Sequence, residues 1–326
     1  MLGERLIWID YAKAIGITLV ILGHVPVPED IKWVIYGFHM PLFFVISGYL
    51  KSQHCNTSVG QMKKIANCLL VPYMIYASAI TLMYCVIKRD MVSVLLPNIL
   101  TANFSKLVGE FTTICPLWFI VSLATMKLFD VVVKNAPPKW QMLLIFLAIA
   151  IAVSYFGIPN YFMLKTTIVC MPFYYLGCCL KKYKAFDECS MLARLPWWGI
   201  LIIIFIYLGC SKSNGQVNLT TCSLGESYLL FLASGTLGSI ALLETLRRLS
   251  KRSNKSDKII VTISEGTLLI MSVHYLMIKP IITIIPTSTV LYWLLDSSLI
   301  LAITYCLILI SKHYCPVLLG KQIVLK

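Results

Sequence analysis

The sequence predicts an all-α integral membrane protein, a bundle of about ten transmembrane helices. Hydrophobic residues make up 59% of the 326 residues and charged residues only 13%, with a mean hydropathy of +0.82. A soluble domain carries about a quarter charged residues. Apolar runs of about 17 to 21 residues recur, each long enough to cross the hydrocarbon core of a membrane as a helix. We therefore expect one multi-pass membrane domain over residues 1–326 and no soluble domain.

The apolar windows place the helices by their length. The first run is not a cleavable signal peptide, because it contains Asp10 and Lys13 and a second span follows at once. The stretch 88–115, which includes "VSVLLPNIL", is expected to hold a short interfacial or re-entrant segment. The ten predicted helices cover residues 6–25, 33–50, 67–87, 116–133, 141–157, 165–181, 197–210, 226–246, 260–283 and 290–311.

The distribution of basic residues predicts the orientation. With both termini in the cytoplasm, 19 of the 28 lysines and arginines fall on the cytoplasmic side and seven outside, and Lys13 and Lys127 lie within helices. This bias follows the positive-inside rule. The formal charge of +14 is therefore explained by membrane topology, and no nucleic-acid partner is expected.

Several kinds of site are disfavoured by what the sequence lacks. No cysteine or histidine cluster has zinc spacing, so no metal site is expected. No nucleophile elbow, Walker loop, HExxH or dinucleotide fingerprint occurs. Most of the twelve cysteines are interpreted as small buried apolar residues. Cys210 and Cys222 flank one loop, and they would pair as a disulfide if that loop faces an oxidising compartment.

Ionisable residues within the first apolar run indicate a functional site, because such groups are costly in a membrane. Asp10 and Lys13 are three residues apart and share a helix face, where the carboxylate would hold the cation. His24 follows Lys13 by eleven residues, which is about three turns and about 16 Å along the same stripe. The alternative is a structural Asp–Lys pair with a histidine snorkelling at the outer interface.

The second predicted helix brings another histidine to a similar depth. In "YGFHMPLFFVISGYL" (36–50), His39 enters from the outer side, and Pro41 interrupts the helical hydrogen bonds. Either His24 or His39 is chemically suited to act as a general base, since imidazole titrates near neutral pH. Gly48 is expected to permit close helix packing.

The segments "RLIWIDYAKAIGITLVILGH" (5–24) and "FHMPLFFVISGYL" (38–50) resemble the membrane-bound acyltransferase family 3. More narrowly, they resemble the branch that O-acetylates bacterial surface glycans. The resemblance continues through "MKKIANCLLVPY" (62–73), "PLWFIVSL" (116–123), "PFYYLGCCLKK" (172–182) and "ISEGTLLIMSVHYLMI" (263–278). The family signature is a basic residue, ten residues and then the catalytic histidine, which Lys13 and His24 match. Lys13 stands where arginine is commoner, and Cys68 stands where a basic residue is expected.

The resemblance implies the fold and the reaction. The family has a ten-helix membrane domain in the bacterial cytoplasmic (inner) membrane, surrounded by lipid. It implies acetyl-CoA as the acyl donor, with no permanently bound cofactor, and a sugar hydroxyl of a surface polysaccharide or lipid-linked glycan as the acceptor. His24 would be the catalytic base. His39 would orient His24, stabilise the oxyanion or position the acceptor, and Asp10 would hold Lys13 or steer CoA. Lys13, Lys63, Lys64 and Trp118 would bind the donor.

Two alternatives remain open on the residues alone. A multi-pass transporter or flippase also needs ionisable groups within its helices, but it predicts paired internal repeats, and no persuasive repeat is visible. A membrane scaffold would tolerate the loss of His24. His274 also lies in a stretch that resembles the family, and we expect it to be structural. An acyl group larger than acetyl is compatible with the sequence.

Overall fold

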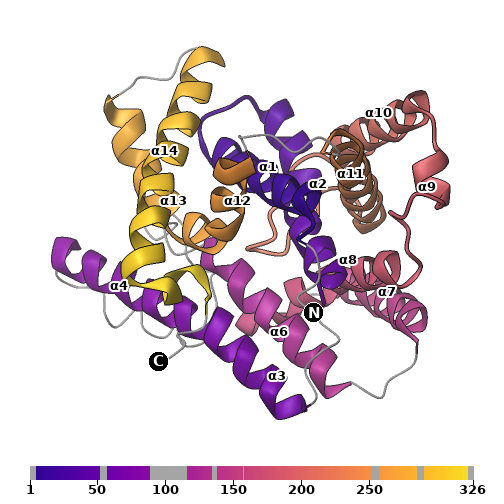
Figure 1. The fold of residues 1–326 in the computed structure, drawn as a ribbon, viewed down its shortest axis with the longest axis horizontal. Helices are drawn as coiled ribbons and strands as arrows, with labels where there is room; N and C mark the ends of the chain where they lie inside the picture. Colours follow the sequence, from indigo (N-terminus) through magenta and orange to yellow (C-terminus); the bar gives the residue numbers. More distant parts are fainter. Residues whose placement is uncertain are drawn as a thin grey trace.

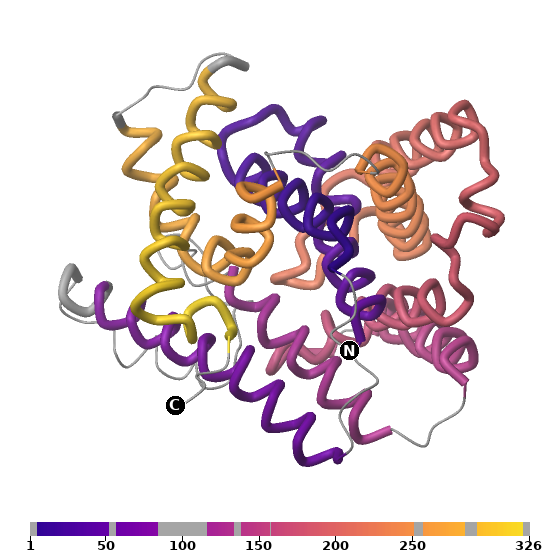
Figure 2. The backbone as a smooth tube through the Cα atoms, viewed as in Figure 1, coloured from indigo at the N-terminus to yellow at the C-terminus, as the bar shows by residue number. Residues whose placement is uncertain are grey.

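The protein is described by a computed structural model over residues 5–51, 57–88, 116–133, 138–156, 158–250, 257–284 and 290–321. Figures 1 and 2 show the helices and the course of the chain. In chain order the elements are α1 Ile7–His24, α2 Glu29–Tyr49, α3 Ser58–Ile65, the π-helical turn η1 Ala66–Leu70, α4 Val71–Lys88, α6 Trp118–Val132, α7 Lys139–Tyr155, the short 3₁₀ turn η4 Tyr161–Met163, α8 Leu164–Lys182, α9 Met191–Arg194, α10 Trp197–Asn214, α11 Tyr228–Leu249, α12 Asp257–Glu265, α13 Thr267–Ile284, α14 Val290–Tyr314 and the 3₁₀ turn η5 Pro316–Leu319.

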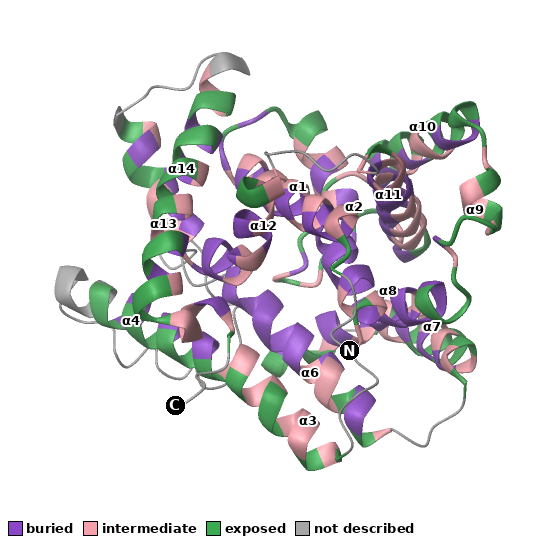
Figure 3. Ribbon diagram, viewed as in Figure 1, coloured by how far each residue is buried: buried purple, intermediate pink, exposed green. Residues whose placement is uncertain are grey.

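The helices α1 and α2 form the centre of the molecule (Figure 1). Helix α1 contacts α2, α11, α12, α13 and α14, and α2 contacts α8, α10 and α11. Every residue of α2 from Gly37 to Ile46 is buried. At the periphery, α10 exposes large apolar side chains such as Phe205, which is 77% exposed (Figure 3). An apolar helix with an exposed apolar surface is typical of contact with lipid.

The described helices support a multi-pass membrane protein. Each of the ten predicted ranges contains at least one helix. Seven helices are long and apolar enough to cross a membrane, or eight if the bent pair α12 and α13 counts as one span. The number ten and the cytoplasmic position of the termini therefore stay predictions. Apart from Lys88, the interfacial segment expected in 88–115 lies outside the described residues.

The prediction of one continuous helix over 260–283 is wrong. Helices α12 and α13 meet at an angle of 78° on either side of Gly266. The side chain of Ile308 from α14 packs against the backbone of Gly266, where a Cβ atom would overlap it. This tertiary contact is invisible in the local sequence, where the apolar pattern continues through the bend.

The prediction that Gly48 permits close helix packing is confirmed. A Cβ atom on Gly48 would overlap the carbonyl oxygen of Tyr174 in α8, and one on Gly177 in α8 would overlap the carbonyl oxygen of Val45 in α2. The two glycines thus let the backbones of α2 and α8 touch, as small residues do between membrane helices. This contact fixes the depth of α2, and with it the position of His39.

Candidate active site

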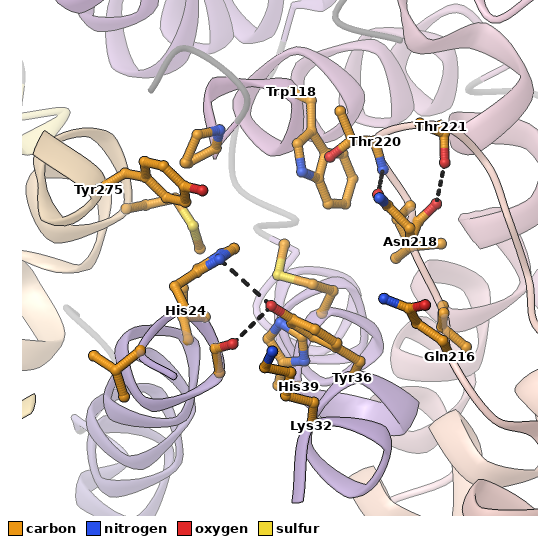
Figure 4. Close-up of a pocket in the computed structure, with 18 of the residues that line it drawn as sticks. His24, Lys32, Tyr36, His39, Trp118, Gln216, Asn218, Thr220, Thr221 and Tyr275 are labelled. Carbon is orange, nitrogen blue, oxygen red and sulfur yellow. Dashed lines mark hydrogen bonds between the residues drawn. The ribbon is translucent and has the colours of Figure 1, made fainter. Parts of the chain in front are cut away.

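A cavity with a volume of about 540 Å³ lies beside the end of α1. We call it the His24 cavity (Figure 4). Its wall includes His24, Tyr36, His39, Trp118 and Tyr275. The loop between α10 and α11 contributes Gln216, Asn218, Thr220 and Thr221, and α2 also contributes the charged Lys32. The cavity therefore joins imidazole rings on one side to amide and hydroxyl groups on the other.

Pro26 places His24 at the end of α1. Pro26 disfavours the helical conformation of the residue before it, and Val25 is extended, so α1 ends at His24. Its imidazole therefore lies at the C-terminus of a helix, where the helix dipole favours a positive charge. This placement suits a base that becomes an imidazolium during a reaction.

Tyr36 fixes which nitrogen of His24 is free. The Tyr36 hydroxyl donates its one proton to the carbonyl oxygen of Gly23 at 2.9 Å (Figure 4). The same hydroxyl oxygen lies 3.4 Å from Nδ1 of His24 and must therefore accept from it. With its proton on Nδ1, neutral His24 carries an unprotonated Nε2. That nitrogen is the atom a general base requires.

His39 and His274 have the same tautomer for a different reason. Nδ1 of His39 donates to the carbonyl oxygen of Ile35 at 2.7 Å, and Nδ1 of His274 donates to that of Ile270 at 2.8 Å. Each neutral ring therefore offers only a hydrogen-bond acceptor at Nε2. Nε2 of His274 is buried without a hydrogen-bond partner among the described residues.

The structure brings His274 next to His24, although the sequence favoured a structural role for it. The two ring centroids are 5.2 Å apart, and the ring of Tyr275 packs against His24 at 5.1 Å. Sequence analysis missed Tyr36, Tyr275 and the 216–221 loop. For Tyr36 a signal existed, since it precedes His39 by three residues and shares its helix face.

Lys13 lines a second cavity of about 260 Å³, which we call the Lys13 cavity. Its wall also includes Phe43, Ser47, Phe119, Glu265 and Leu268. Four helices, α1, α2, α6 and α13, contribute to both cavities. Along each of them, the residues of one cavity follow those of the other, as Lys13 precedes Val20 and His24 on α1. The two cavities therefore lie end to end along the bundle.

The expected pairing of Asp10 with Lys13 is not formed. Asp10 accepts hydrogen bonds from Nε of Arg5 at 2.6 Å and from Oγ of Ser264 at 2.5 Å. Arg5 also pairs with Glu265 at 2.8 Å, and Lys312 and Lys321 pair with the same carboxylate. The hydrogen bonds to Asp10 and Glu265 raise the pKa of Arg5. Asp10 is buried, and the charge-assisted hydrogen bond from Arg5 compensates for the burial of its carboxylate.

The remaining predicted donor residues occupy different positions. Lys63 and Lys64 are exposed at the end of α3 and belong to the wall of neither cavity. Lys64 lies one helical turn before Cys68. Trp118 lines the His24 cavity, while its neighbour Phe119 lines the Lys13 cavity. Of the four residues predicted to bind the donor, only Lys13 lines the Lys13 cavity.

Cys210 and Cys222 do not pair, because both are free thiols. Cys222 is instead packed beside Thr166, the residue that anchors the 216–221 loop by donating to the carbonyl oxygen of Leu219 at 2.8 Å. Burial raises the pKa of the Cys222 thiol. Within the described ranges, histidine, cysteine and carboxylate side chains form no group that could hold a metal ion.

Fold and site together define a multi-pass helical membrane protein with a histidine-lined cavity and a lysine-lined cavity that lie end to end along the bundle. Comparison with known families agrees with this class, since the family model of the acyltransferase 3 domain matches residues 6–311. The chain belongs to the membrane-bound acyltransferase family 3. It is also similar to the nodulation protein NolL of Mesorhizobium japonicum, with 50% identity over a region that covers 13% of this chain and 14% of that protein. No solved structure matches the chain.

Proposed function

We propose that the protein transfers an acetyl group from acetyl-CoA to a sugar hydroxyl of a surface polysaccharide or lipid-linked glycan, with His24 as the general base. The observation that carries the proposal is the contact of the Tyr36 hydroxyl, which donates to the carbonyl oxygen of Gly23, with Nδ1 of His24 at 3.4 Å in the wall of the His24 cavity. This contact favours the tautomer with its proton on Nδ1 and an unprotonated Nε2. Membership of an acyltransferase family supplies the reaction class. The protein would act in the bacterial inner membrane.

The step is a single acyl transfer. Nε2 of His24 takes the proton of the acceptor hydroxyl while the oxygen attacks the carbonyl carbon of the thioester. The carbon–sulfur bond then breaks, and the thiolate of CoA takes the proton back from Nε2. The products are the O-acetyl ester and free CoA, and His24 returns to its starting state.

The two cavities suit two substrates of different chemistry. Lys13 lines its cavity within about 16 Å of His24 along α1, so its ammonium group would meet a phosphate of CoA while the pantetheine arm extends toward His24. The 216–221 loop presents amides and hydroxyls to the His24 cavity, and such groups recognise the hydroxyls of a sugar. The donor would thus enter from the Lys13 side and the acceptor from the loop side.

His39 is better suited to bind the acceptor hydroxyl than to stabilise the oxyanion. Its Nδ1 hydrogen is used by the carbonyl oxygen of Ile35, so neutral His39 has no proton left to donate to an oxyanion. Its Nε2 accepts a hydrogen bond from a sugar hydroxyl instead. Tyr36, whose hydroxyl contacts Nδ1 of His24, would orient the His24 ring instead of His39. Asp10, held by Arg5 and Ser264, would shape the Lys13 end of the path without contact with the reacting atoms.

The test is transfer of label from radiolabelled acetyl-CoA to glycans in membranes of the host, at matched protein abundance. We expect His24→Ala to abolish incorporation. His313→Ala is the matched control, because His313 is exposed at the end of α14 and lines neither cavity. Equal incorporation by wild type and His24→Ala would exclude His24 as the base. No incorporation by wild type with its host glycans present would favour the transporter alternative.

A further inference from the structure

Among the residues that the structure describes, only Met271 lines both the His24 cavity and the Lys13 cavity. It lies on α13 and is 3% exposed. Leu268, three residues earlier, lines the Lys13 cavity, and Tyr275, four residues later, lines the His24 cavity. Residues at these spacings share a helix face. One face of α13 therefore runs past both cavities, with Met271 at their boundary.

The partition at this boundary is also thin on α2 and α6, whereas on α1 the wall residues nearest to it, Lys13 and Val20, are seven residues apart. On α6 the neighbours Trp118 and Phe119 line different cavities. On α2 the change occurs between Met40 and Phe43, within one helical turn. Because a turn rises about 5.4 Å, the two cavities are separated by about one layer of side chains.

The chemistry of the boundary favours passage of a thin, flexible chain. Methionine is unbranched, has three rotatable side-chain bonds and adapts its shape more readily than leucine or a ring. The nucleotide of CoA is bulky and carries phosphates, so it stays on the Lys13 side, and the glycan stays on the His24 side. The acyl-pantetheine arm is the one part of either substrate that must cross the boundary.

We infer that Met271 is the gate through which the acyl-pantetheine arm passes from the Lys13 cavity to the His24 cavity, and that its side chain limits the size of the acyl group. This inference rests on the proposed function. Its side chain must rotate to let the arm through, and it then lies beside the acyl chain next to His24. A smaller residue admits a larger acyl group, and a rigid bulky residue blocks the arm.

The experiment compares Met271→Trp and Met271→Ala with the control Met277→Trp in permeabilised membranes that contain the host glycans. Met277 also lies on α13 but lines neither cavity. Two donors distinguish the gate from the site: labelled acetyl-CoA, which must cross the boundary, and labelled S-acetyl-N-acetylcysteamine, a short thioester that can enter the His24 cavity directly. We expect Met271→Trp to lower transfer from acetyl-CoA by roughly 50-fold or more and to lower transfer from the short donor much less. The control Met277→Trp should change both by less than about threefold.

Met271→Ala tests the size limit separately. We expect the ratio of butyryl-CoA to acetyl-CoA transfer to rise by about fivefold or more, since each methylene accommodated in an apolar pocket is worth roughly tenfold or more in discrimination. Full transfer from acetyl-CoA by Met271→Trp, or an unchanged acyl preference in Met271→Ala, would overturn the inference. Wild-type membranes that transfer label from neither donor would contradict the proposed function itself, a result distinct from any effect of the gate variants.

Discussion

The hydroxyl oxygen of Tyr36 lies 3.4 Å from Nδ1 of His24 on the adjacent helix, while the Tyr36 hydroxyl donates to the carbonyl oxygen of Gly23. This geometry predicts that Tyr36→Phe lowers kcat by about 10- to 100-fold, because a hydrogen bond to the imidazolium formed in the reaction is worth about 1.5–3 kcal/mol. The KM for acetyl-CoA should change little. The measurement is steady-state acetyl transfer in membranes.

Tyr228→Phe is the control for that variant. It also removes a buried hydroxyl that donates to a carbonyl oxygen, that of Val169, but it lies outside both cavities. If the two variants lose activity to the same extent, Tyr36 acts only through stability.

His274 leads to a second prediction, in which stability and activity change in opposite directions. Leaving its buried Nε2 without a partner costs about 1–3 kcal/mol. His274→Phe keeps an aromatic ring against His24 and removes that unpaired atom. We expect the variant to be at least as stable as wild type in thermal unfolding and yet slower in acetyl transfer. A variant that is stable and fully active would show that Nε2 of His274 has no function.

Substitution of Lys13 should weaken binding of acetyl-CoA, which carries phosphates, and should leave transfer from a phosphate-free donor unchanged. Lys13→Gln is expected to raise the KM for acetyl-CoA by about tenfold, since one charge-assisted hydrogen bond to a phosphate is worth about 1.5–3 kcal/mol. Transfer from S-acetyl-N-acetylcysteamine should be unchanged. An equal loss with both donors would mean that Lys13 supports the fold and does not bind CoA. Lys13→Arg, which keeps the charge, should restore binding.

The contact between α2 and α8 should tolerate no side chain at its glycines. Gly48→Ala introduces a Cβ atom where the carbonyl oxygen of Tyr174 lies, so we expect a loss of about 1–3 kcal/mol or more. Gly209→Ala on α10 is the matched control, because no atom beyond its own helix and its chain neighbours lies within 4 Å of its Cβ position. Thermal unfolding in detergent measures both. Equal unfolding midpoints would contradict the close approach of the two helices.

The pair of Arg5 and Asp10 can be tested by a double-mutant cycle. The Asp10 side chain is 8% exposed and that of Arg5 is 47% exposed, so solvent screens part of their interaction. Arg5→Ala should cost about 1–2 kcal/mol, because it leaves a buried carboxylate poorly compensated. Adding Asp10→Asn should restore part of this loss. Strictly additive effects in thermal unfolding would show that the ion pair contributes nothing.

Local sequence was sufficient to predict most of the helices and to predict that Lys13 and His24 lie on one face of α1. Hydropathy and helix periodicity place each helix within a few residues, because burial in lipid depends on the composition of each segment alone. The eleven-residue spacing of Lys13 and His24 likewise places them on one face of α1, and they line two different cavities. The bend at Gly266 is not visible in the apolar pattern, and the residue that packs against it, Ile308, belongs to another helix.

Tertiary structure alone decided which polar groups meet. Asp10 lies three residues before Lys13 in α1, yet it binds Arg5 and Ser264, which approach from outside α1. Three helices bring Tyr36, His24 and His274 together, and this contact gives His24 its tautomer. The relative positions of residues on one helix follow from their spacing in the sequence. Contacts between helices depend instead on close packing across interfaces such as that of Gly48 and Gly177, which no single segment encodes.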